Sequence, residues 1–134
     1  MRDLIEKHYN REVYNPDMGK ALETWSGELE RLAENTQYNY KRGVSMFLEH
    51  LGTDLDGLYE MKLDDIRSDD PRDSRRVERL ISQYMFQQAR EGYSARSAGR
   101  IGVAVGHFIR SQGLTFTLLK NDWPKGQSIG QRMI

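Results

Sequence analysis

Two arginines near the start of one predicted helix carry the clearest chemistry in this sequence. Arg96 and Arg100 are four residues apart, so they lie on the same face of a helix. A guanidinium group binds phosphate or guanine through paired hydrogen bonds, and the hydroxyls of Ser94 and Ser97 can donate to phosphate oxygens. The free N–H groups of a helix start also favour anions. These residues predict a phosphate-binding face; the alternatives are a solvated basic face and, for Ser94, helix capping alone.

The helix that carries these residues has clear boundaries in the sequence. Ser94 is a typical N-cap residue, and Gly113 supplies the left-handed conformation that commonly ends a helix. The apolar residues between them recur at helical spacing and predict one buried stripe: Ala98, Ile101, Val105, Phe108 and Ile109. The opposite face holds the basic residues Arg96, Arg100, His107 and Arg110. This helix is therefore predicted to pack on one side and to present cations on the other.

The composition predicts a single polar-surfaced domain. The chain has 134 residues, of which 37% are hydrophobic and 30% charged, and its mean hydropathy is −0.78. It has no run of the roughly 18 apolar residues that a membrane span needs, and no signal-peptide pattern. It has no cysteine, which excludes disulfides and Cys-ligated zinc. We expect no membrane association and a cytoplasmic location, associated with the nucleoid.

Charge is distributed unevenly along the chain although the formal net charge is zero. Residues 1–70 hold 9 Lys/Arg and 16 Asp/Glu, whereas residues 71–134 hold 11 Lys/Arg and 4 Asp/Glu. A basic half rich in arginine is the electrostatic footprint of nucleic-acid binding. The alternative is a dipolar surface that has no partner.

Two packed helices are predicted in the first half of the chain. Residues 20–33 form the first, and residues 36–51 the second, with Thr36 as its N-cap and Gly52 as its end. Their predicted core residues are Leu22, Trp25, Leu29, Leu32, Tyr40, Val44, Phe47, Leu48 and Leu51. The residues predicted to face away on the second helix are Tyr38, Lys41, Arg42 and Ser45.

The middle of the chain predicts an acidic connection followed by another helix. Residues 53–73 are rich in turn formers, with at most a short helical turn at residues 63–66. Ser74 is predicted to open a helix that Gly92 closes. Its predicted core stripe is Val77, Leu80, Ile81 and Tyr84, and the residues predicted to point away are Arg75, Arg79 and Phe86. With no strand alternation, the chain is predicted to be all-α: a compact bundle of four main helices, with a short helix or an arm at residues 1–19.

Two helices resemble a family pattern. Thr36-x-x-x-Tyr40-x-x-x-Val44-x-x-Phe47 resembles the T-x-x-x-Y-x-x-x-L-x-x-F helix in the N-terminal core-binding domain of tyrosine recombinases, the phage-integrase family. The helix after Ser94 resembles the last helix of that domain. Its matching positions are Ser94, Ser97, Ala98, Ala104, Val105 and Phe108. Asn121-Asp122-Trp123-Pro124 stands where the family's closing turn precedes the linker, and its tryptophan resembles archaeal members. Gly102 and Gly106 depart from the pattern and would permit a close helix–helix or helix–backbone approach.

The resemblance implies a SAM-like helical bundle of four to five helices that forms one half of a clamp around double-stranded DNA. A separate catalytic domain, in cis in a full-length protein, would form the other half, and further recombinase protomers would share the DNA. The domain would span residues 20–123, after an arm at 1–19 and before a linker at 124–134. Its second and last main helices would face the duplex.

The second candidate patch for DNA contact lies at the start of the helix at 36–51. It comprises Lys41 and Arg42 with Thr36 and Gln37. A third patch comprises Arg75 and Arg79, with Arg76; here a solvated face, or pairing with the acidic segment, is the alternative. The aromatic residues Trp25, Tyr40, Phe47 and Phe108 are interpreted as core rather than as base-stacking residues.

Two segments match the sequence pattern of the family's catalytic His-x-x-Arg motif. They are His107-Phe-Ile-Arg110 and His8-Tyr-Asn-Arg11. Catalysis in that family needs further basic residues around the scissile phosphate and a downstream tyrosine nucleophile, and no tyrosine follows Arg110. We interpret both matches as coincidental and expect no enzyme activity, cofactor or metal for this chain.

Two other functions remain open from the sequence. The acidic first half could dock a basic protein partner, which would make the chain a helical interaction module. Alternatively, the helices at 74–90 and 94–112 could form the helix-turn-helix of a stand-alone DNA-binding regulator, since Gly92 lies in a short turn between them.

Overall fold

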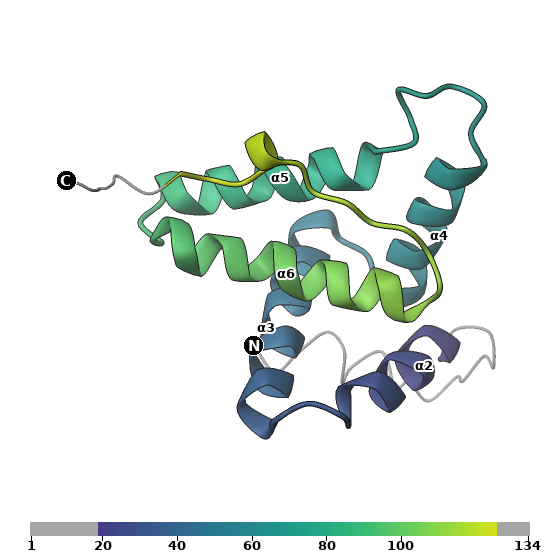
Figure 1. The fold of residues 1–134 in the computed structure, drawn as a ribbon, viewed down its shortest axis with the longest axis horizontal. Coiled ribbons are helices and arrows are strands. Elements are labelled where there is room, and N and C mark those ends of the chain that lie inside the picture. The colour runs from purple at the N-terminus through teal and green to yellow at the C-terminus, as the bar shows by residue number, and fades with distance from the viewer. Residues whose placement is uncertain (1–18, 126–134) are drawn as a thin grey trace.

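The computed structural model describes residues 19–125, which form five α-helices and no strand. The helices are α2 (Lys20–Leu29), α3 (Glu34–Leu51), α4 (Leu55–Arg67), α5 (Arg76–Arg90) and α6 (Ala95–Ser111), followed by the short 3₁₀ helix η1 (Lys120–Asp122). They pack as one compact bundle (Figure 1). The predicted all-α bundle is confirmed, while the predicted arm and most of the predicted linker, with His8 and Arg11, lie outside the described residues.

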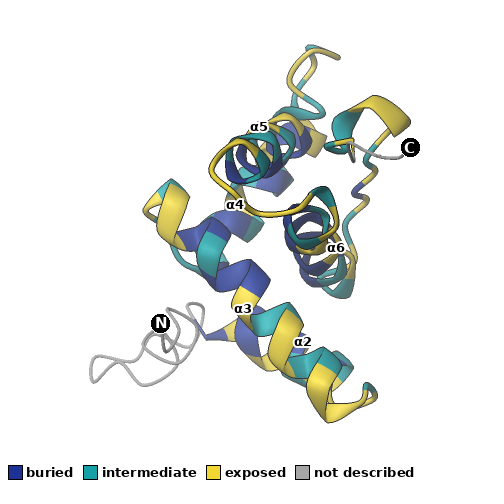
Figure 2. Ribbon diagram, turned by 90° about the vertical axis from the view of Figure 1, so that its left-hand side faces the viewer, coloured by how far each residue is buried: buried dark blue, intermediate teal, exposed yellow. Residues whose placement is uncertain are grey.

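Helices α5 and α6 form an antiparallel hairpin that α3 crosses on one side (Figures 1 and 2). The most extensive helix–helix contact is between α3 and α6. Gly43 lies at this crossing: a Cβ placed there would be 2.9 Å from the Ala104 Cβ and 3.4 Å from the Ile101 Cα. The two helices therefore approach closely because α3 has no side chain at this point.

The core lies where the inner faces of the helices meet (Figure 2). Both predicted stripes of the N-terminal half contribute: Trp25, Val44 and Phe47 are fully buried. Trp25 meets Phe108 of α6 edge-on, with ring centroids 5.3 Å apart. The stripe of α6 is buried as predicted: Ala98, Ile101, Val105, Phe108 and Ile109. Ser45 is the exception on α3, since it was predicted to face away and is 1% exposed.

The acidic segment at 53–73 was wrongly predicted to be mostly turns. It contains α4, a helix of 13 residues whose N-cap Asp54 accepts a hydrogen bond from the Gly57 N–H at 2.8 Å. The buried face of α4 consists of Leu55, Leu58, Lys62 and Asp65. Because half of this stripe is charged, its helical period is hidden from an apolar pattern.

Those two charged residues of α4 are neutralised by α5. The Lys62 ammonium donates to a Glu78 carboxylate oxygen at 2.6 Å, and their side chains are 2% and 4% exposed. Asp65 accepts from the Val77 N–H at 2.8 Å and pairs with the Arg76 guanidinium at 3.0 Å. Asp65 of α4 thus accepts a hydrogen bond from a backbone N–H in the first turn of α5, a role that a residue just before the helix usually has.

Three predicted helix starts and ends are corrected by the structure. Ser74 does not cap α5, which begins at Arg76; its hydroxyl instead donates to the Pro71 carbonyl. Thr36 does not cap α3, which begins two residues earlier at Glu34. Helix α2 ends at Leu29 rather than near residue 33, because residues 30–32 form a turn. The predicted terminating glycines are confirmed: Gly52, Gly92 and Gly113 have φ values of 75°, 119° and 83°.

The segment after Gly113 runs back along the α5–α6 hairpin (Figure 1). It fills the space that the glycines of α6 leave: Cβ positions at Gly102 and Gly106 would both lie 3.1 Å from it, at Leu118 and Phe116. The close neighbours of these glycines are side chains, with Met85 of α5 also packed against Gly102, and not another backbone. Polar contacts hold the same segment, since Glu78 accepts from the Thr117 N–H and Ser82 donates to the Asp122 carbonyl. Within residues 19–125, no helix is long and apolar enough to cross a membrane.

Candidate nucleic-acid interface

The start of α6 has the geometry that its sequence predicts. The Ser94 hydroxyl oxygen accepts from the Ser97 N–H at 3.0 Å, which makes Ser94 the N-cap. The Ser94 hydroxyl in turn donates to the Ser97 hydroxyl oxygen at 3.1 Å. The Ser97 hydroxyl keeps its own proton for another acceptor. Capping thus occupies Ser94, whereas Ser97 retains a donor near the first turn of the helix.

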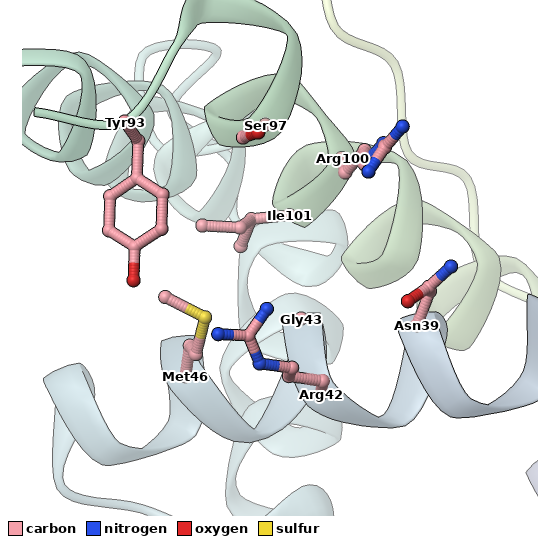
Figure 3. A pocket seen from close by; sticks show the side chains of 8 residues that line it. All are labelled: Asn39, Arg42, Gly43, Met46, Tyr93, Ser97, Arg100 and Ile101. Atoms are coloured by element: carbon pink, nitrogen blue, oxygen red, sulfur yellow. The ribbon is translucent and has the colours of Figure 1, made fainter.

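A pocket of about 90 Å³ lies between α3 and the first two turns of α6 (Figure 3). It brings together two of the predicted patches, because Arg42 of α3 and Ser97 and Arg100 of α6 all line it. Its other lining residues are Asn39, Gly43, Met46, Tyr93 and Ile101. Figure 3 shows the Arg42 guanidinium between the two helices and Arg100 on the α6 side. Residues far apart in the sequence thus form one basic site with an apolar floor.

The arginines of this face have no acidic partner among the described residues. Arg42, Arg96 and Arg100 are exposed and make no ion pair or side-chain hydrogen bond there. Other arginines form ion pairs: Arg75 pairs with Asp122 at 2.6 Å, and Arg76 pairs with Asp65. Unpaired guanidinium groups keep all their donors available for a ligand.

The remaining residues of the second patch do not line the pocket. Thr36 lies half-buried inside the first turn of α3, and Lys41 is half-buried one residue before Arg42. Gln37 is engaged locally, since its amide donates to the Leu32 carbonyl at 2.9 Å and so fixes the α2–α3 turn. The patch predicted on this helix is therefore reduced to Arg42 at the pocket itself.

The third patch lies on α5, away from the lining of the pocket. Arg75 donates to the Thr117 carbonyl at 2.9 Å in addition to its ion pair with Asp122. That carboxylate is partly buried, which opposes its ionisation, but the Leu119 N–H and the Arg75 guanidinium outweigh burial and lower its pKa. Arg79 is exposed on α5 and has no partner among the described residues. Arg75 thus anchors the C-terminal segment, while Arg79 remains a separate surface cation.

The two residues of the His-x-x-Arg match on α6, His107 and Arg110, each make a contact within the fold. The Nδ1 of His107 accepts from the indole N–H of Trp25 at 3.0 Å. Burial lowers the pKa of His107, as does Arg110, while Glu28 opposes the shift. Arg110 donates to the Phe116 carbonyl at 3.1 Å. The first contact ties α2 to α6, and the second ties α6 to the segment that follows it.

Four pocket residues were not identified from the sequence: Asn39, Gly43, Met46 and Tyr93. Asn39 and Met46 precede and follow Arg42 by three and four residues, so helical spacing places them on its face. The position of Tyr93 had no such signal, because only the packing of the α5–α6 turn against α3 brings it there (Figure 3). Among the described residues, no group of histidines and acids is arranged to hold a metal ion.

No protein-family model, curated protein or solved structure matches this chain.

Proposed function

We propose that this chain is a DNA-binding module, the core-binding domain of a tyrosine recombinase, which grips the backbone of core-site DNA for a separate catalytic domain. Catalysis and the tyrosine nucleophile would belong to that domain, and other protomers would share the DNA. The observation that carries the proposal is the convergence of Arg42, Ser97 and Arg100 on one pocket. These residues come from the two helices that the family resemblance assigns to the duplex-facing side.

The electrostatics of this face support binding to phosphates. Arg42, Arg96 and Arg100 are exposed, and no acidic side chain of the described residues neutralises them. Phosphate contacts would supply most of the affinity, with few base contacts, so binding would be weak for the isolated domain and steeply dependent on salt. Such a protein would be found with the nucleoid.

The proposal is tested by reversing the charge of this face. The double variant R96E/R100E should reduce affinity for duplex DNA by at least about a hundredfold at low salt, because two phosphate contacts become repulsive. Helical CD should not change, since both residues are exposed and an acidic residue at position 96 is favourable in the first turn of α6.

A matched control changes the net charge equally at a distant site. Arg31 and Arg72 have side chains that are 77% and 88% exposed, and both form only surface ion pairs. The variant R31E/R72E should retain affinity within about fivefold of the wild type, since only the overall field changes. Equal losses in the two double variants would show that net charge, rather than this face, governs binding.

The antiparallel packing of α5 and α6 weighs against a helix-turn-helix regulator. In that motif the two helices meet at about 90–120°, whereas α5 and α6 lie side by side along most of their length (Figures 1 and 2). A protein-interaction module remains the second candidate. Absence of any DNA affinity at low salt would favour it over DNA binding.

A further inference from the structure

The pocket between α3 and α6 has the chemistry of a binding site for a single phosphate group. Its lining carries donors that have no partner among the described residues: the guanidinium groups of Arg42 and Arg100 and the amide N–H groups of Asn39, with the Ser97 hydroxyl beside them. Among residues 19–125, no acidic residue lines it. A pocket of this composition selects an anion, and arginine matches the geometry of phosphate oxygens.

The volume of the pocket suits a small group. About 90 Å³ holds about six water-sized groups, which is enough for a phosphate group. The floor is made of the apolar residues Gly43, Met46 and Ile101. An apolar floor lowers the local dielectric constant and strengthens the attraction between guanidinium and phosphate.

The two arginines belong to different helices, α3 and α6, whose backbones approach closely at their crossing. Gly43 adjoins Arg42 in the sequence, and its Cβ position would lie 3.7 Å from the Arg100 carbonyl oxygen. This contact places the helix backbones that carry the two guanidinium groups against each other. The pocket thus presents guanidinium donors from both helices.

We infer that Arg42 and Arg100 bind one and the same phosphate group, with Asn39 and Ser97 as additional donors. The inference rests on the proposed function only in naming a DNA phosphodiester as the source of that phosphate. A free phosphate offers the same chemistry, and the experiment distinguishes the two sources.

The first arm uses inorganic phosphate and does not depend on DNA. Titration at constant ionic strength should produce saturable NMR shifts at the Arg Nε–H groups of Arg42 and Arg100 and at the Ser97 amide. These shifts should vanish in R42Q and in R100Q but persist in the control R72Q. Shifts that are absent from the pocket, or that survive both pocket variants, would overturn the inference.

The second arm uses a short duplex and a double-mutant cycle. R42Q and R100Q should each weaken DNA binding by about tenfold. The loss of affinity in the double variant R42Q/R100Q should be much smaller than the product of the two single losses, because both residues bind the same phosphate. The slope of log K against log salt should fall by about 0.9 in the double variant, as for one lost phosphate contact. The matched pair R42Q/R96Q should instead be multiplicative, since Arg96 does not line the pocket.

The two arms separate failure of the inference from failure of the proposed function. If DNA binds but R42Q and R100Q act independently, with a slope change of about 1.8, the shared phosphate is wrong and the DNA-binding function stands. If DNA does not bind while phosphate shifts the pocket residues, the function is wrong and the pocket accepts a phosphate from another source.

Discussion

The α4–α5 side and the α3–α6 side of this bundle use charged residues in opposite ways. Between α4 and α5, Lys62 and Glu78 are buried and satisfy each other. At the pocket between α3 and α6, Arg42 and Arg100 are exposed and have no partner among the described residues. The role of a cation in this bundle thus depends on whether the fold supplies its counter-charge. Paired cations here stabilise the fold, whereas unpaired cations remain available for a ligand.

The largest effect on stability should come from breaking the buried pair. K62M removes the ammonium and leaves the Glu78 carboxylate buried without its partner, so the free energy of unfolding should fall by about 3–5 kcal/mol. Denaturant unfolding followed by tryptophan fluorescence measures this loss. The double variant K62M/E78Q should recover a large part of it, because glutamine is neutral and still accepts from the Thr117 N–H. An equal loss in both variants would show that packing, rather than the unpaired charge, causes the effect.

The next largest effect should come from the helix crossing that shapes the pocket. G43A places a methyl group 2.9 Å from the Ala104 Cβ and 3.4 Å from the Ile101 backbone, and overpacking should cost about 1–3 kcal/mol. The matched control G27A lies in α2, where nothing is within 4 Å, and should stabilise by about 0.5–1 kcal/mol. Thermal unfolding of both variants is the measurement. Stabilisation by G43A would contradict a tight α3–α6 contact.

A smaller difference should separate a paired arginine from an unpaired one. R75Q removes an ion pair with Asp122 and a hydrogen bond to the Thr117 carbonyl, and should destabilise by about 1 kcal/mol. R42Q removes no contact within the described residues and should change stability by less than about 0.5 kcal/mol. DNA affinity, by contrast, should fall more in R42Q than in R75Q. If R75Q weakens DNA binding as much as R42Q does, the division between the two sides is wrong.

The smallest effect should be a pH dependence that arises from His107. Because burial lowers its pKa from 6.5, the unfolded chain binds this proton at a higher pH than the folded protein does. Stability should therefore be complete above 6.5 and should decrease as the pH falls toward the lowered pKa. Protonation would also remove the acceptor that Trp25 uses. In H107Q the unfolding free energy should change less between about pH 8 and pH 6 than in the wild type. An equal change in both proteins would contradict this role of His107.

Much of the candidate site could be predicted because it depends on local rules. The Ser94 cap, the stop at Gly113 and the exposed Arg96 and Arg100 follow from side-chain chemistry and helical spacing within one segment. Helix α4 could not be predicted in this way. Its buried face includes Lys62 and Asp65, and nothing local indicates that α5 will neutralise them.

Local spacing predicted four of the five helices, each with one apolar face and cations on the other, because these features depend on residues a few positions apart. Helix α4 is the exception, since charged residues lie on its buried face. Only the tertiary structure decided which of those cations stay free. Arg75 and Arg76 pair with acids on distant segments, whereas Arg42 and Arg100 line one pocket beside the α3–α6 crossing. The physical reason is that counter-charges and close backbone approaches are supplied by packing between helices, which no single segment encodes.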